Sequence, residues 1–552
     1  MYKVYLPGGT VKEYPENTTL LDISKEFASK FSSPIVAGMM DGEEKDLQYK
    51  ITDGVRIGFI ELDSRIGMRV YTSSLIMVLY TAMLECLPGL PRLLVKSQFA
   101  NNVYCEAVSE EQLPENYVCI IKKHMQEIIE QDEPIVRQRV SRVITEKILK
   151  KQGDYDRLGI IEQLDPERET LSTYSCRGVS SYFFSPMVPY AGYLKTFDLI
   201  EYHGRMLLRH PSTGKDLVME PFIDQPKLAG TLAEAEKWSK IIGCDTIQKL
   251  NKIIAEEQTT SIIRVAEALH EKKIISIADK IAQAGQKVKV ILVAGPSSSG
   301  KTTFVQRLKV HLQVNGITPV PISIDDYFLG HDKTPRKPNG DLDFESINAL
   351  DLDLFNEHLK LLLEGKEIDA PTFNFKAGAR EYLGNKMSVA PGQLLLIEGL
   401  HGLMEELTRV VPPEEKMKIY ICPMAQLRMD AHNLVEKNEI RLMRRIVRDN
   451  RTRGHNARNT IKQWKYVLEG EEENIYPFQE NADVMFNTAL IYEMGVLKKH
   501  VQPLLLEIKN DVPEYTTAKR LLNLLDYIDS IEDSEITRNS ILREFIGGSW
   551  FH

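Results

Sequence analysis

An uninterrupted apolar run, Val288–Ala294, that leads into a glycine- and serine-rich loop is the feature that most constrains how this chain folds. A short run of this kind predicts a strand buried on both faces, as in parallel sheets covered by helices. The stretch after the loop, Thr303–Val314, is compatible with a helix. A strand, a loop and a helix in this order predict an α/β domain.

The loop matches the pattern G-x-x-x-x-G-K-[ST] over residues 295–302. Its glycines allow backbone N–H groups to surround phosphate oxygens, and the helix N-terminus adds positive potential. We expect Lys301 to contact the β- and γ-phosphates of ATP and the Thr302 hydroxyl to bind Mg²⁺. The alternative is a glycine- and serine-rich loop beside a surface lysine. The predicted ATP-binding residues are Gly295, Pro296, Ser297, Ser298, Ser299, Gly300, Lys301, Thr302 and Thr303.

Acidic residues follow two further strand candidates. Asp325 and Asp326 follow the strand-like run Ile317–Ile324, and Glu398 follows Leu394–Ile397. Doubly wound sheets bind ligands at the carboxyl ends of their strands, so we expect these carboxylates to lie near the loop. Asp325 could then act as a general base, and Asp325 and Glu398 could hold Mg²⁺ or its waters. The alternative is an acidic pair that caps a turn.

A basic run recurs at helical spacing and predicts one positively charged helix face. Such a face could clamp transferred phosphoryl charge. The alternative is a solvated or RNA-binding face. The run consists of Arg441, Arg444, Arg445 and Arg448, continued by Arg451 and Arg453-Gly454.

With these pieces in order, the segment from about 286 to 500 resembles the phosphoribulokinase/uridine kinase family of P-loop proteins. The resemblance implies an ATP-dependent kinase that transfers the γ-phosphoryl group to the 5′-hydroxyl of a nucleoside. Phosphorylated sugars and pantothenate are the alternative acceptors. The motifs that carry it are Gly295–Thr302, Asp325-Asp326-Tyr327-Phe328, Phe344–Asp351, Pro371–Arg380, Glu398-Gly399, Arg444–Asp449 and Arg453-Gly454.

The same resemblance implies catalytic roles for individual residues. Asp325 would accept the hydroxyl proton, while Thr302, Asp325 and Glu398 would place Mg²⁺. Four basic residues would stabilise the phosphates, namely Lys301, Arg445, Arg448 and Arg453. Arg453 would do so from a lid.

The resemblance also implies an acceptor pocket. Glu345 stands where the family uses an aspartate to hold the ribose hydroxyls, and Tyr327 and Phe373 stand at aromatic positions of the base pocket. The family's pyrimidine-reading histidine is replaced by Lys376-Ala377-Gly378, so the nucleobase stays open. His455 replaces a family arginine in the lid.

The first 220 residues resemble the TGS module and editing-type domain of threonyl-tRNA synthetase, through Arg69–Leu75 and Ser175–Gly178. The positions of that domain's four metal ligands read Tyr71, Leu75, Cys176 and Ser180 here. One thiol cannot hold Zn²⁺, so we expect no hydrolytic editing and a buried Cys176. The second functional hypothesis is an RNA- or ribosome-associated regulator, in which residues 1–220 bind RNA and the P-loop acts as a nucleotide switch.

The predicted fold class is multidomain, α+β and α/β, because 552 residues exceed one ordinary core. The basic stretch Ile135–Lys150 and the apolar stretch Ser73–Leu84 are helix candidates, as are Thr516–Ile528 and Ile536–Phe545 near the end of the chain. The predicted domains are a TGS-like β-grasp domain (1–61), an editing-like α+β domain (62–220), a helical connector (221–285), a P-loop kinase domain with a doubly wound parallel sheet (286–510) and C-terminal helices (511–552).

Composition restricts the binding partners and the cellular location that we expect for the protein. A net charge of −9 argues against a chain that binds nucleic acid over its whole surface. Six cysteines without C-x-x-C spacing favour reduced thiols. The N-terminus lacks a signal-peptide pattern, and the apolar stretch Leu75–Leu84 is shorter than the roughly 20 residues of a membrane span. We therefore expect a cytoplasmic protein with no membrane partner. We also predict a homo-oligomer.

Overall fold

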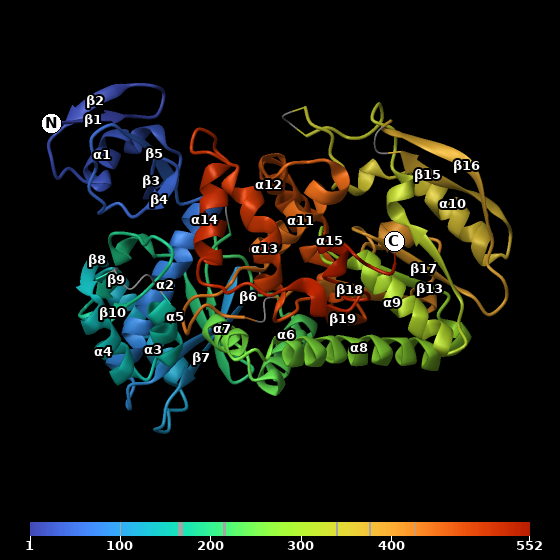
Figure 1. Cartoon of the computed structure of the whole chain (residues 1–552), viewed down its shortest axis with the longest axis horizontal. Helices are drawn as coiled ribbons and strands as arrows, with labels where there is room; N and C mark the ends of the chain where they lie inside the picture. Colours follow the sequence, from blue (N-terminus) through green and yellow to red (C-terminus); the bar gives the residue numbers. More distant parts are fainter. Residues whose placement is uncertain are drawn as a thin grey trace.

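The computed structural model describes residues 1–99, 101–163, 169–212, 217–337, 340–374, 377–424 and 427–551. Figure 1 shows the first sheet at one end of the molecule, the parallel sheet toward the other end, and the long helix α8 (Thr259–Ala284) along one side.

The N-terminal sheet has the order β2-β1-β5-β3-β4, with β1 and β5 parallel and the other pairs antiparallel. Helix α1 buries Leu20, Ile23 and Phe27 against it and begins with a capping box between Thr19 and Asp22. This region is therefore a mixed sheet covered by one helix. Its elements are β1 (Tyr2–Tyr5), β2 (Val11–Tyr14), α1 (Leu20–Phe27), β3 (Ile35–Met40), β4 (Glu43–Lys45) and β5 (Val55–Glu61).

Two antiparallel sheets follow, of orders β11-β12-β7-β6 and β10-β9-β8. The elements are α2 (Arg65–Cys86), β6 (Arg92–Phe99), β7 (Asn102–Val108), α3 (Tyr117–Glu130), β8 (Val136–Ser141), α4 (Arg142–Gln152), α5 (Tyr155–Gln163), β9 (Thr170–Cys176), β10 (Val179–Ser181), β11 (Asp198–Tyr202) and β12 (Arg205–Arg209).

Two expectations for this region were wrong. The basic stretch Ile135–Lys150 is not one helix, because Val136–Ser141 pairs with β9 as strand β8 before α4 begins. Helix α2 starts at Arg65 rather than Ser73, so it is long and apolar enough to cross a membrane. However, 83% of its apolar window is buried inside the protein.

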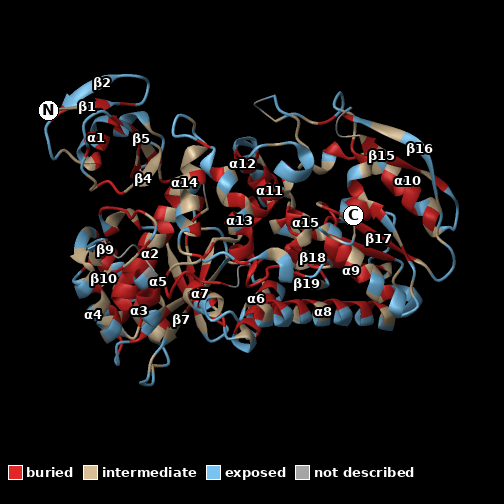
Figure 2. Cartoon of the chain, in the orientation of Figure 1, coloured by how far each residue is buried: buried red, intermediate tan, exposed pale blue. Residues whose placement is uncertain are grey.

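The predicted connector is helical but packs as part of the C-terminal core. Helix α8 places Ile263, Ile274 and Ile277 in the same apolar cluster as α9 and the parallel sheet. Figure 2 shows its buried face toward the sheet and its exposed face outward. The two helices before it are α6 (Pro226–Ile242) and α7 (Ile247–Ala255).

The sheet of the C-terminal half has the order β14-β17-β13-β18-β19, and all its strands are parallel. Strand β13 is buried at every residue, as its apolar run predicts. The hairpin β15–β16 was not anticipated. The elements are β13 (Val290–Ala294), α9 (Lys301–Val314), β14 (Pro319–Ser323), α10 (Leu352–Leu363), β15 (Ile368–Asn374), β16 (Ala379–Met387), β17 (Leu394–Gly399), β18 (Lys416–Cys422), α11 (Lys437–Arg448), α12 (Ala457–Asn474), β19 (Val484–Asn487) and α13 (Glu493–Leu506).

The end of the chain packs into this core as well. Helix α14 (Tyr515–Leu525) contacts both α13 and β4, so it joins the C-terminal half to the N-terminal sheet (Figure 1). The expected helix Ile536–Phe545 forms only as the short α15 (Arg543–Ile546) after a series of turns. The side chains of Ile541, Leu542 and Phe545 in this segment are nevertheless fully buried.

Candidate active site

The phosphate-binding loop lies between β13 and α9 and is closely packed from below. A Cβ atom at Gly295 would lie 2.2 Å from the Ile421 carbonyl oxygen, so only glycine fits there. Gly300 has φ of +90°, and a Cβ there would lie 2.5 Å from Ile541. The left-handed backbone and the close neighbour both require glycine. Packing therefore restricts the backbone of the loop at both of these glycines.

Lys301, the first residue of α9, folds back over the loop. Its ammonium group donates to the carbonyl oxygens of Gly295 at 2.9 Å and Pro296 at 3.3 Å. The next residue, Thr302, is exposed, so its hydroxyl is open to a ligand. These are the positions that a lysine and a threonine need beside a polyphosphate.

The predicted carboxylates meet at the carboxyl edge of the sheet. Glu398, near the end of β17, lies opposite Val293 of β13 and Ser323 of β14. Burial raises its pKa to about 7 against the opposing effect of Lys301, and the neighbouring Asp325 raises it further. The phosphate loop, Glu398 and Asp325 therefore share the carboxyl edge of the parallel sheet.

Asp325 follows β14 in a short 3₁₀ turn and remains accessible at this edge. The surrounding protein still displaces enough water to raise the pKa of its carboxyl, while Lys301, Arg453 and Arg448 lower that pKa. The four residues predicted to be catalytic thus interact electrostatically around one point.

The arginine face of α11 divides into two functional pairs. The first pair is structural. Arg441 donates to the Ser297 carbonyl at 3.0 Å and to Glu471 at 2.7 Å. Arg444 is fully buried and donates to Glu493 at 2.7 Å. The expectation that all four arginines clamp the phosphoryl group is therefore wrong for these two, which hold the loop and the neighbouring helices.

The second pair, Arg445 and Arg448, is only partly buried. Arg445 donates to the Ser297 hydroxyl at 2.9 Å, and Arg448 donates to Asp449 at 2.7 Å. Asp449 also lies 3.7 Å from Arg453, which is half exposed. This arginine group ends in a π-helical turn, Asp449–Arg453, a form common at functional sites. The guanidinium groups of this arginine group could therefore bind anionic oxygens beside the loop.

Glu345 packs against helix α12 within electrostatic reach of Lys301 and Arg445. Burial and the neighbouring Glu471 raise its pKa to about 7, against the effects of Arg445, Lys337 and Lys301. A Cβ at Gly470 would lie 2.3 Å from the Glu345 side chain, so helix α12 packs directly on it. The position fits a carboxylate that receives hydroxyl groups beside the loop.

The two predicted base-pocket aromatics have different environments. Phe373 is mostly buried and packs edge-on against Phe328, with ring centroids 5.6 Å apart. Tyr327 is 2% exposed, and its hydroxyl bonds to His358 at 3.0 Å. These contacts give Tyr327 a structural role in the core.

His331 is a candidate that the sequence alone did not suggest. Its ring lies 2.1 Å from where a Cβ of Gly378 would stand, and the backbone N–H of His331 donates to the Gly378 carbonyl oxygen at 3.0 Å. The ring also packs against Phe344, with centroids 5.6 Å apart. An imidazole therefore fills the space beside Gly378, although residues 375 and 376 of this motif lie outside the described part of the chain.

The synthetase-like positions are filled by core packing. Tyr71, Leu75 and Cys176 are all buried, and Tyr71 donates its hydroxyl to the Thr196 carbonyl at 2.9 Å. Burial raises the pKa of the Cys176 thiol to about 11, in agreement with the predicted buried residue. Within the described ranges, no three histidine, cysteine or acidic residues are grouped to hold a metal.

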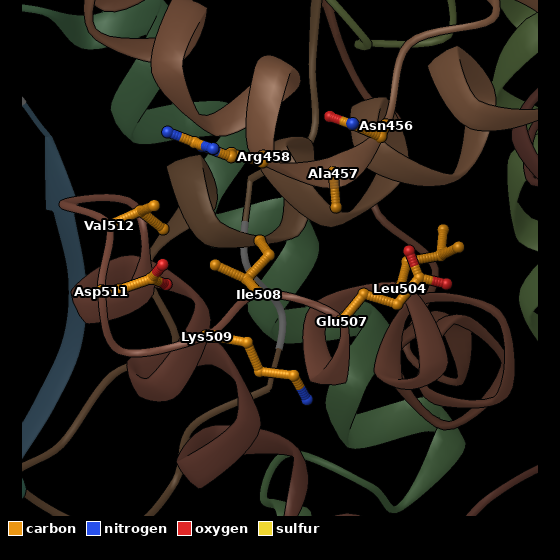
Figure 3. A pocket seen from close by; sticks show the side chains of 9 residues that line it. All are labelled: Asn456, Ala457, Arg458, Leu504, Glu507, Ile508, Lys509, Asp511 and Val512. Atoms are coloured by element: carbon orange, nitrogen blue, oxygen red, sulfur yellow. The ribbon is translucent and has the colours of Figure 1, made fainter.

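A cavity of about 210 Å³ lies between α12, the end of α13 and the segment after it (Figure 3). None of the predicted site residues lines it. Its lining residues include Asn456, Arg458, Glu507, Lys509 and Asp511.

The parallel sheet with its loop, carboxylates and arginines defines a P-loop kinase domain. Residues 290–491 match the model of the phosphoribulokinase/uridine kinase family, so this part of the chain is a domain of that family. A uridine kinase from Deinococcus deserti is 29% identical over 197 residues, which cover 36% of this chain and 86% of that protein.

The N-terminal region is similar to a second group of proteins. Threonine–tRNA ligase 1 from Bacillus subtilis is 28% identical over 215 residues, which cover 37% of this chain and 31% of the ligase. The chain thus spans about a third of the length of that relative. A solved structure of a possible uridine kinase from Bacillus stearothermophilus matches 39% of this chain and 98% of its own, with 17% identity and a TM-score of 0.28.

Proposed function

We propose that the protein is an ATP-dependent nucleoside kinase that phosphorylates the 5′-hydroxyl of its acceptor. The observation that carries the proposal is Asp325 at the carboxyl end of β14, where Lys301 of the phosphate loop, Arg448 and Arg453 all act on its carboxyl electrostatically. A nucleotide switch does not need a base at that point. A kinase does, because the attacking hydroxyl must lose its proton.

The proposed reaction uses the residues as follows. Asp325 takes the proton of the acceptor hydroxyl, whose oxygen attacks the γ-phosphorus as the bond to ADP breaks. Lys301, Arg448 and Arg453 neutralise the charge that moves onto the phosphate oxygens. Glu345 orients the acceptor through its ribose hydroxyls.

The chain also offers oxygen donors that suit Mg²⁺, namely the exposed Thr302 hydroxyl and the carboxylates of Glu398 and Asp325. These residues would hold the ion, which when bound supplies positive charge to the phosphate oxygens.

The test is ADP formation by the full chain with a panel of ribonucleosides and deoxyribonucleosides, together with phosphorylated sugars and pantothenate. We expect turnover with at least one ribonucleoside, and a loss of kcat of about 100-fold or more in Asp325→Asn. Asp326→Asn is the matched control, because that neighbouring carboxylate accepts the Phe373 N–H instead. Turnover restricted to a phosphorylated sugar or pantothenate would refute the nucleoside as acceptor but would still support kinase activity.

A second candidate is an RNA- or ribosome-associated regulator. Its basis is the similarity of the N-terminal region to threonine–tRNA ligases, together with the core packing at Tyr71, Leu75 and Cys176. Salt-sensitive tRNA binding by the full chain, unaffected by Asp325→Asn, would favour this candidate. An absence of tRNA binding at low salt would rule it out.

A further inference from the structure

The C-terminal segment (residues 536–551) places a carboxylate on the phosphate-binding helix. Glu544 accepts hydrogen bonds from the backbone N–H of Thr303 at 3.0 Å and from its hydroxyl at 2.9 Å. Thr303 is the third residue of α9 and is fully buried. The contact therefore occupies one of the N–H groups at the helix N-terminus.

The backbone of this segment is held firmly in place. Ile541, Leu542 and Phe545 are fully buried in the main core. Arg451, in the π-helical turn of the lid, donates to the carbonyl oxygens of Glu544 at 2.9 Å and Phe545 at 3.1 Å. Displacing the segment would expose several large apolar side chains to water, which is unfavourable.

The Glu544 side chain can move without displacing this backbone. Glu544 is half-buried, in contrast to its apolar neighbours, so its carboxylate can rotate toward solvent while the backbone stays fixed. The same carboxylate also raises the pKa of Glu398, so the two carboxylates interact electrostatically.

A nucleotide phosphate and this carboxylate require the same place. The first N–H groups of a helix after a glycine-rich loop are the donors that bind phosphate, and they carry the positive end of the helix dipole. A donor that is bound to Glu544 is not available to a phosphate oxygen, and the two negative charges repel each other.

We propose that Glu544 is an autoinhibitory group that keeps the loop in a nucleotide-free state and must turn away from Thr303 before a nucleotide binds. The proposal rests on the proposed function only in that the loop binds a nucleotide.

The test is calorimetric binding of ADP to the full chain, in EDTA and again with Mg²⁺. We expect Glu544→Gln, which keeps the shape and removes the charge, to bind ADP about five- to tenfold more tightly than the wild type in both conditions. Glu535→Gln is the matched control, because Glu535 is an exposed carboxylate nearby in the C-terminal tail, and it should leave the affinity unchanged. Glu544→Asp, whose carboxylate is one methylene too short to reach Thr303, should also bind ADP more tightly and serves if the first variant is unstable.

Unchanged or weaker ADP binding by Glu544→Gln would overturn the proposal. A loss of affinity that appears only with Mg²⁺ would also overturn it, since the carboxylate would then serve the metal. If neither the wild type nor any variant binds ADP, the nucleotide site itself is refuted. Tighter ADP binding without turnover of any nucleoside would support this inference and contradict the nucleoside kinase assignment.

Discussion

Arg441 and Glu471 form a two-pronged ion pair in which both side chains are fully buried, and Arg441 also holds the Ser297 carbonyl of the phosphate loop. The pair joins α11 and α12 to the loop. Its charges are compensated only while both partners are present.

Removal of one partner of this pair should be strongly destabilising. Glu471→Leu leaves a buried guanidinium without its counter-charge, so we expect a loss of about 3–5 kcal/mol in the free energy of unfolding. The double variant Arg441→Met with Glu471→Leu should recover most of it. Urea denaturation measures both, and a single-variant loss below about 1 kcal/mol would contradict the paired arrangement.

Lys301→Met should abolish nucleotide binding without affecting the fold. Within the described residues, the ammonium group donates hydrogen bonds only to carbonyl oxygens of the loop, so its removal costs little stability. We expect ADP affinity to fall at least about 100-fold, because the charge-assisted contacts to the phosphates are lost. Calorimetry and thermal unfolding separate the two effects. Lys309→Met, further along the same helix, serves as the control.

Glu345→Gln should change how stability depends on pH. The folded-state pKa of about 7 lies above the ordinary value of 4.5, so the contribution of Glu345 to stability is fully present below about pH 4.5 and is lost as pH rises through 7. The glutamine variant lacks this loss. It should therefore gain about 1–2 kcal/mol relative to the wild type between pH 5 and pH 8. Equal pH profiles of the melting temperature in both proteins would show that Glu345 is not buried as described.

Gly378→Ala should displace the His331 ring. The new methyl group would overlap the imidazole, and the backbone φ of +65° disfavours alanine, so we expect a stability loss of about 1 kcal/mol or more. His331→Ala removes the ring without backbone strain. If the imidazole borders the acceptor pocket, both variants should change the KM for the nucleoside and leave the KM for ATP unchanged. Identical acceptor profiles would exclude His331 from the pocket.

A fragment of residues 286–510 should be less stable than one of residues 221–552. The apolar core of the kinase domain includes Ile263, Ile274, Leu521 and Phe545, which lie outside the shorter fragment. Far-UV circular dichroism during thermal unfolding tests this. A shorter fragment with an unchanged melting temperature would show that these helices are dispensable.

The sequence by itself determined the phosphate loop, the buried strand before it and the acidic residues at the ends of neighbouring strands. Those features depend on local spacing and on the rule that parallel strands end at one edge, so they can be deduced without coordinates. The same local reasoning placed four arginines on one face of α11 but could not tell which of them lie inside.

Only the tertiary structure decided which partners those residues meet. Arg441 is buried because Glu471, 30 residues away, supplies its counter-charge. Thr303 is capped because Glu544 returns to it from 241 residues further along the chain. Contacts at such separations depend on the packing of whole elements and leave no periodic pattern in the sequence. The sequence therefore determined where phosphate can bind, and the tertiary fold decided what holds and blocks that site.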